Sequence, residues 1–257
     1  MSDNEYVNPP GAAYDIISHP SRRNEAIEVA LMRDHRFAFY YWFKWWKKSN
    51  WDLPSANAPP LVSIDWHRDL CAPDDVEKQE LQQMNLESYK ETALFCWDKL
   101  NPFNDGHILS AAYLNLIGDI YVLCKQDSGL IEPTFKDQWN NDHLVKCFDS
   151  AEELYSELSS IENNNAYFDI DLDYFVQSNA PCGGGLVTLL DNEVSSLLHT
   201  DSDLMKWLFH RMSGMTIATE PEFCGGLTNS NKIFNALDTT LFNSSLFSQA
   251  ATWTHLN

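Results

Sequence analysis

The hydrophobic positions of this chain form short apolar runs, separated by stretches in which apolar residues recur at helical spacing. Short apolar runs between polar turns are typical of buried strands, and repeats every three to four residues predict helices. Loops are expected at 1–25, 52–60, 125–143 and 179–185, where Pro, Gly and polar residues gather. We expect strands at 26–32, 61–64, 117–124, around 169 and at 215–219, and helices at 37–46, 76–100, 108–116, 151–163, 191–199, 204–212 and from 229 onward.

Strands alternate with helices along the whole chain, a pattern that predicts a mainly parallel sheet with helices on both faces. We therefore expect an α/β protein with a three-layer αβα architecture. A length of 257 residues is ordinary for one such domain, and we find no internal repeat or linker. The sequence predicts a single domain that spans 1–257.

Polar residues of one chemical kind follow two of the predicted strands. Asp65, His67 and Asp69 alternate with other residues at the end of the run 61–64. Residues two apart in an extended chain point the same way, so these side chains share one face. Two carboxylates and an imidazole form a partial site for a divalent metal. Taken alone, the motif also fits a solvated loop.

The stretch 167–175 repeats this logic with Asp169, Asp171 and Asp173. Carboxylates that repel one another at the end of an apolar run reduce stability unless a cation compensates them. Because this cost occurs in both stretches, a metal site is favoured over two strands that each expose one face to solvent. His35 and Glu222 also follow predicted strands, and sites in open parallel sheets lie outside the carboxyl ends of the strands.

Composition narrows the class of protein. Hydrophobic residues make up 44% of the chain, enough for a large core, and 37 acidic against 17 basic residues give a net charge of −20. This charge argues against a nucleic-acid partner and is compatible with a cationic substrate. The six cysteines contain no Cys-x-x-Cys pair, the first ten residues lack a signal-peptide pattern, and no apolar run could span a bilayer. We expect a soluble, cytoplasmic protein with reduced thiols and no membrane partner.

The order of these motifs is similar to that of the arginase (ureohydrolase) family. The amino-acid sequence of the motifs most resembles a divergent branch of this family, which includes the bacterial peptide arginases of ribosomal peptide maturation. The resemblance rests on the segments 34–37, 65–70, 168–175 and 218–226, which together span most of the chain.

The resemblance implies the arginase/deacetylase fold and two Mn²⁺ ions per chain. One ion would be held by His35, Asp65, Asp69 and Asp169. The other would be held by Asp65, His67, Asp169 and Asp171, so that Asp65 and Asp169 bridge. Oxygen and imidazole ligands without thiolate suit Mn²⁺. Two such ions, about 3.5–4 Å apart, can share a hydroxide at neutral pH.

That hydroxide would attack the guanidinium carbon of arginine, and collapse would give ornithine and urea. The resemblance suggests His107 as the proton donor to the leaving amine, although a turn residue there is equally expected. Glu222 would bind the guanidinium by a charged two-point contact, with Glu220 as its competitor. Asp173 would orient the loop that carries Asp169.

Two departures from the arginases bear on the substrate. The glycines that precede the first histidine are absent, and the residues after Asp69 do not resemble the loop that grips the α-amino and α-carboxylate groups of free arginine. An arginine side chain within a ribosomally made precursor peptide fits better. The sequence indicates neither the peptide nor the oligomeric state.

Three alternatives remain. An arginase-like or agmatinase-like enzyme would act on a small guanidine compound. A zinc deacetylase would act on an amide, but such enzymes usually carry a tandem histidine pair, which this chain lacks. A binding protein on a decayed enzyme fold is disfavoured because all six expected ligands are present.

Overall fold

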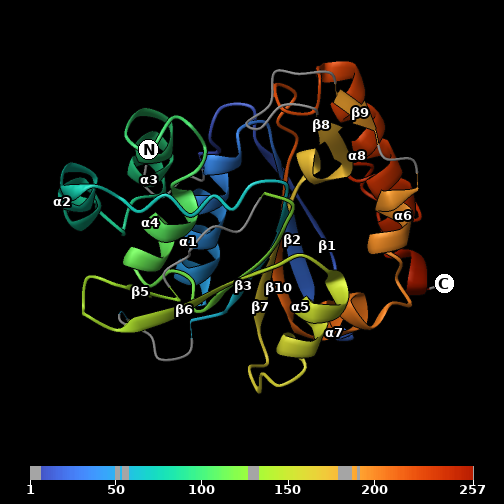
Figure 1. Ribbon diagram of the computed structural model, residues 1–257, viewed down its shortest axis with the longest axis horizontal. Coiled ribbons are helices and arrows are strands. Elements are labelled where there is room, and N and C mark those ends of the chain that lie inside the picture. The colour runs from blue at the N-terminus through green and yellow to red at the C-terminus, as the bar shows by residue number, and fades with distance from the viewer. Residues whose placement is uncertain are drawn as a thin grey trace.

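The chain folds around one mixed sheet that lies between two layers of helices (Figure 1). This computed structural model describes residues 7–49, 53, 58–126, 133–178, 187–189 and 192–256. The predicted three-layer α/β architecture with a mainly parallel sheet is confirmed.

The sheet has eight strands, and its two outermost strands run antiparallel to their neighbours while the inner ones run parallel. A separate hairpin pairs Val176–Ser178 (β8) with Val187–Leu189 (β9). The spatial order of the large sheet is β1 (Ala13–Ser18), β2 (Ala26–Met32), β10 (Met212–Ala218), β7 (Ala166–Asp171), β3 (Leu61–Asp65), β4 (Ile120–Cys124), β6 (Asp142–Phe148) and β5 (Thr134–Lys136).

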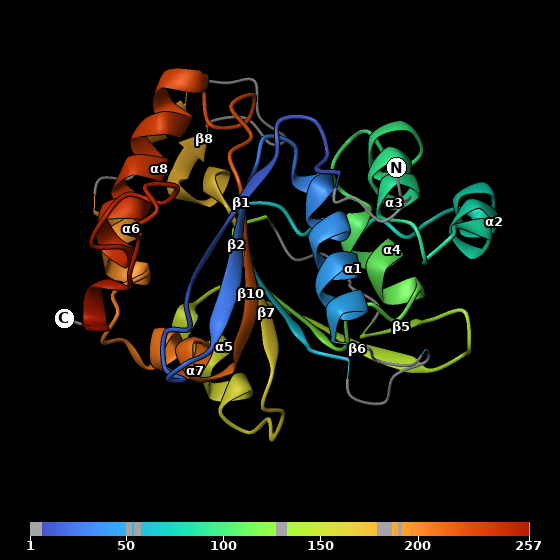
Figure 2. The same ribbon diagram turned by 180° about the vertical axis from the view of Figure 1, so that it is seen from behind.

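The helices divide between the two faces, as the opposite views of Figures 1 and 2 show. Short 3₁₀ helices cover His35–Phe37, Leu172–Phe175 and Thr254–Leu256. One layer contains α1 (Ala38–Lys48), α2 (Asp75–Gln83), α3 (Tyr89–Asp98) and α4 (His107–Tyr113), and the other contains α5 (Ala151–Leu158), α6 (Glu193–Leu197), α7 (Asp203–Arg211) and α8 (Leu227–Leu241).

Each face of the sheet has its own hydrophobic core. Helix α1 lies in one of them, at the position of the helix expected at 37–46, and its residues from Ala38 to Trp46 are all buried. Alternate residues of β7 serve the two cores: Tyr167 faces the α1 layer, whereas Phe168 and Ile170 pack on the other side. Asp169 and Asp171 therefore share the α1 face with Tyr167.

Two of the expected loops contain strands. Residues 13–18 form the edge strand β1, and β5 with the start of β6 lies within 125–143. Edge strands bond to one neighbour only and have one wet side, so their hydrophobic pattern is weak. The expected loop 179–185 and most of 52–60 lie outside the described residues.

The chain reverses its direction of travel across the sheet between β3 and β7. From β3 it proceeds outward to β4 and β6, and from β7 it proceeds to β10 on the opposite side. Such a switch point opens a crevice at the carboxyl ends of the two strands. Asp65 is the last residue of β3 and Asp171 the last of β7, so both stand at this crevice.

In the described part of the chain, no helix has both the length and the apolar character to cross a membrane. Of the cysteines within it, Cys71, Cys96, Cys124, Cys147 and Cys224 are free thiols.

Candidate metal centre

His35 lies at the middle of a buried cluster of carboxylates. Its ring is fully buried, and its backbone N–H donates to Oε1 of Glu220 at 2.9 Å. Nδ1 lies near one oxygen of each of three aspartates, 3.0 Å from Asp69, 3.3 Å from Asp171 and 3.4 Å from Asp65, yet it forms no aligned hydrogen bond with described residues. Ligands about 2.1 Å from one ion at right angles lie about 3.0 Å apart, so this spacing suits a shared cation.

Asp65 connects this group to a second one. Its Oδ1 accepts the backbone N–H of His67 at 2.7 Å, whereas its buried Oδ2 has no hydrogen-bond partner among the described residues. Asp65 belongs to two sets of residues that can each hold an ion, one with His35 and Asp171 and one with His67 and Asp69. A carboxylate shared by two sets is what a binuclear site requires.

Asp173 completes the second group. Its Oδ2 lies 2.9 Å from Nδ1 of His67, and its Oδ1 accepts the backbone N–H of Trp66 at 3.1 Å. Oδ1 of Asp171 accepts the backbone N–H of Asp173 at 3.0 Å, so the 3₁₀ turn after β7 aims both carboxylates at the same crevice.

Asp169 lies deeper in the sheet than the sequence led us to expect. It pairs in register with Ser63 of β3 and Thr216 of β10. Oδ1 accepts the Thr216 hydroxyl at 2.5 Å, while Oδ2 accepts the Ser63 hydroxyl at 2.8 Å and lies 2.8 Å from Nε2 of His35. These groups hold Asp169 within the sheet, and the residue set that can hold an ion with His35 and Asp65 includes Asp171 and not Asp169. The expected bridging role therefore fits Asp171 better, and Asp169 orients the histidine.

The charges of the cluster perturb one another strongly. Burial, and then the charges of Asp69 and Asp173, raise the pKa of Asp65 well above its usual range. Burial and Asp173 raise the pKa of Asp171 to about 7. The pKa of His35 is also raised, because Asp169 and its other carboxylate neighbours outweigh the effect of burial. Without a cation, protons must compensate these charges, so the cluster is suited to bind cations.

Two residues of the site have left-handed backbones, Asp69 with φ of 52° and Glu220 with φ of 26°. Residues other than glycine rarely adopt such angles, and they persist where surrounding contacts enforce them. Both side chains reach the cluster, which places this strain at the candidate centre.

The two candidate guanidinium ligands occupy different environments. Glu220 is buried, and its Oε1 also accepts a hydrogen bond from Nδ2 of Asn104 at 2.5 Å. Burial, and then the charge of Asp171, raise the pKa of Glu220 well above its usual value. The Glu222 side chain is 58% exposed and forms an ion pair with Arg33. The structure therefore places Glu220 at the site, and Glu222, our first choice from the sequence, outside it.

His107 lies inside the protein rather than on the wall of an open site. Its ring is fully buried, 4.3 Å from the ring of His35 and stacked on Trp42 at 5.5 Å. Nδ1 lies 3.0 Å from the carbonyl oxygen of Asn104. Burial and then the charge of His35 lower its pKa to about 4, so the ring is neutral at pH 7 and poorly suited to donate a proton.

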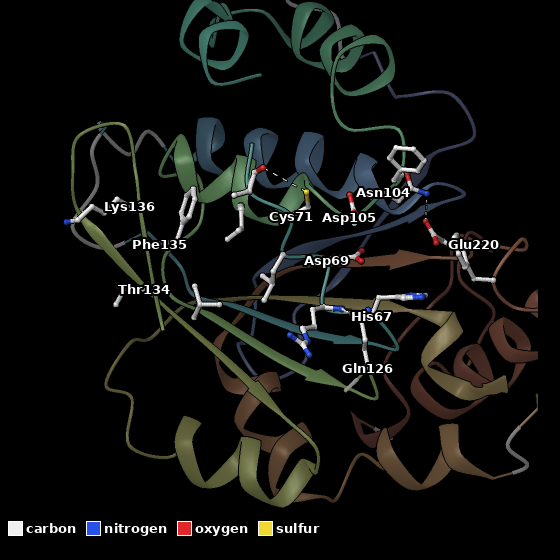
Figure 3. A pocket seen from close by; sticks show the side chains of 17 residues that line it. His67, Asp69, Cys71, Asn104, Asp105, Gln126, Thr134, Phe135, Lys136 and Glu220 are labelled. Carbon is white, nitrogen blue, oxygen red and sulfur yellow. Dashed lines mark hydrogen bonds between the residues drawn. The ribbon is translucent and has the colours of Figure 1, made fainter. Parts of the chain in front are cut away.

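A cavity of about 780 Å³ opens onto the cluster (Figure 3). His67, Asp69 and Glu220 line its inner end, and Lys136 and Phe135 lie toward the opposite end of the view. The volume is within the range of pockets for small-molecule ligands, about 300–1,000 Å³. A polar substrate can thus reach the carboxylates from solvent.

The structure brings together most of the residues selected from the sequence: His35, Asp65, His67, Asp69 and Asp171. Asp169 touches only His35 of these, and Glu222 is not among the residues that line the cavity. The ligand-like position of Asp173 was missed, although the alternation 169, 171, 173 contains it. No protein-family model matches this chain, and no curated protein sequence matches it.

Proposed function

We propose that this chain is a Mn²⁺-dependent peptide arginase, a hydrolase of linear amidine C–N bonds that converts arginine side chains of a precursor peptide to ornithine and urea. The observation that carries the proposal is the convergence of His35, Asp65 and Asp171 from three separate strands or strand ends onto one buried point. A donor set of one imidazole with carboxylate oxygens favours Mn²⁺ over a structural zinc site.

The ligand assignment that we propose differs from the sequence expectation by one step along β7. His35, Asp65, Asp69 and Asp171 would hold one ion, and Asp65, His67, Asp171 and Asp173 the other. Two ions bound there would supply a hydroxide nucleophile near neutral pH.

The side chains around this point are arranged to receive a cation. Glu220 presents a buried carboxylate to the cavity, fixed by the His35 backbone and by Asn104. A guanidinium donates two parallel hydrogen bonds to such a carboxylate and remains protonated. His67 lines the same cavity with a side chain that is 19% exposed, and as a ligand of the second ion it would be a neutral imidazole.

The experiment is mass spectrometry of an arginine-containing peptide incubated with the purified, Mn²⁺-loaded protein, with urea assayed in parallel. We expect a mass loss corresponding to ornithine, an equal amount of urea, and neither product with Asp171→Asn. Lys232→Gln, at an exposed position on α8, is the matched control and should retain activity. If urea is released from free arginine or agmatine but not from the peptide, the substrate is a small guanidine compound instead. No urea from any guanidine, with metal bound, would refute the proposal.

A further inference from the structure

One basic side chain of the cavity has no ion-pair partner among the described residues. Arg68 lines the cavity between two residues of the cluster, His67 and Asp69. Its Nε is buried without a hydrogen-bond partner, and no carboxylate of the described chain lies within ion-pair distance of its guanidinium. Its backbone N–H donates to Oε1 of Gln126 at 3.2 Å, which fixes the base of the side chain at the cavity wall.

This arrangement is unusual in a chain with a net charge of −20. Burying the Nε of a guanidinium without a partner costs free energy. Other arginines of the described chain have found carboxylates, as Arg22 has with Glu25 and Arg33 with Glu222. The second cation of the cavity, Lys136, is paired with Asp142 at 3.0 Å. Unlike these three basic residues, Arg68 has no carboxylate partner and is available to a ligand.

The charge of Arg68 also acts on residues outside the metal cluster. Its charge acts on Cys147 of β6, whose pKa is lowered first by a hydrogen bond from Cys124 and then by Arg68. The cavity therefore has the carboxylates Asp69 and Glu220 and the guanidinium of Arg68 in its lining, and the charge of Arg68 also acts on Cys124 at the end of β4.

We propose that Arg68 binds a carboxylate of the substrate, so that the site selects a guanidinium and a carboxylate on one molecule. A planar guanidinium matches a carboxylate by two parallel hydrogen bonds, which makes this the anion that a single arginine recognises best. The inference rests on the proposed function for the guanidinium half. The carboxylate has two possible sources, an acidic residue beside the target arginine or the α-carboxylate of a C-terminal arginine.

Binding to the full-length protein in its metal-free form separates recognition from turnover. Calorimetry compares acetyl-Gly-Arg-Glu-amide with acetyl-Gly-Arg-Gln-amide, and acetyl-Gly-Arg with its C-terminal amide. We expect the carboxylate member of at least one pair to bind about tenfold more tightly. A preference confined to the first pair identifies an acidic neighbour, and one confined to the second identifies the α-carboxylate.

Three variants complete the test. Arg68→Gln should bring the two members of the preferred pair within about twofold while leaving the affinity for the uncharged peptide unchanged. Arg68→Lys should retain part of the preference because it keeps the charge. Lys232→Gln should behave like the wild type.

Equal affinities in both pairs for the wild type, including no binding of any peptide at millimolar concentration, would overturn the anion site. A loss in Arg68→Gln that is equal for charged and uncharged peptides would also overturn it, because that result indicates a structural role. If the carboxylate preference is present but the Mn²⁺-loaded protein releases no urea, the proposed function fails and the anion site stands.

Discussion

Nε2 of His35 lies 2.8 Å from a carboxylate oxygen of Asp169, and this contact decides which ring nitrogen faces the carboxylate cluster. With Nε2 held inside the sheet, Nδ1 is left for the cavity side, where three aspartates surround it. A carboxylate behind a ligating histidine fixes its ring and increases its basicity. Asp169 and Asp171, two residues apart on one strand, therefore have different roles.

Asp169→Asn and Asp171→Asn should affect metal binding to different extents. Loss of a supporting carboxylate costs about 10–100-fold in metal affinity, so Asp169→Asn should still bind Mn²⁺ at raised concentration. Asp171→Asn removes a ligand proposed for both ions and should abolish binding of the pair. Titration calorimetry with Mn²⁺ measures both. If Asp171→Asn binds normally and Asp169→Asn does not, the sequence-based ligand set is the correct one.

Asp173→Asn should reduce the metal content from two ions per chain to one. Its Oδ2 contacts only the His67 side of the cluster, so the His35 group stays intact. Equilibrium dialysis followed by elemental analysis gives the stoichiometry, with Asp105→Asn, a cavity carboxylate outside both groups, as the control. Two ions retained in Asp173→Asn would remove this residue from the site.

Glu220→Gln and Glu222→Gln should separate the two candidates for guanidinium binding. Glu220→Gln removes a buried charge at the cavity and should raise KM for an arginine peptide at least tenfold, about the value of one charged hydrogen bond. Glu222→Gln breaks only an exposed ion pair with Arg33 and should leave KM within twofold. Steady-state kinetics with equal metal content in both variants provides the comparison. The reverse order would restore Glu222 to the site.

The metal-free protein should become less stable as pH rises from 5.5 to 8. The folded pKa of Asp171, about 7, exceeds its ordinary value of 3.8, so the folded state holds a proton that the unfolded state has released. Stability from this proton is lost as pH rises toward and through 7. His35, whose pKa is also raised, acts in the same direction.

Thermal midpoints measured across this range in a chelator test the effect. Asp171→Asn should flatten the dependence and increase the midpoint at pH 8, because the repelling charge is gone. With Mn²⁺ present the trend should reverse, since metal binding requires deprotonated ligands and strengthens as pH rises. A metal-free midpoint that increases with pH in the wild type would contradict the buried, protonated cluster.

Much of the fold follows from local patterns in the sequence. The apolar runs at 26–32 and 61–64 coincide with β2 and with most of β3, because buried parallel strands need continuous apolar residues. The edge strands β1 and β5 escaped the same criterion, since their pairing depends on a neighbour already in place and not on their own hydrophobicity.

The sequence also determined which residue types converge, but not how deeply each side chain is buried in the sheet. Residues two apart in a strand point to the same side, so Asp169, Asp171 and Asp173 share one side of the chain. The sequence pattern alone does not distinguish among them. Only the register of β7 between β3 and β10 fixes Asp169 beside Ser63 and Thr216 inside the sheet. In the same way, 218–226 offers two glutamates of equal chemistry. The left-handed backbone at Glu220 turns that side chain inward, and Glu222 is left to Arg33 at the surface. Tertiary structure decides such choices because burial and charge depend on neighbours that are distant in sequence.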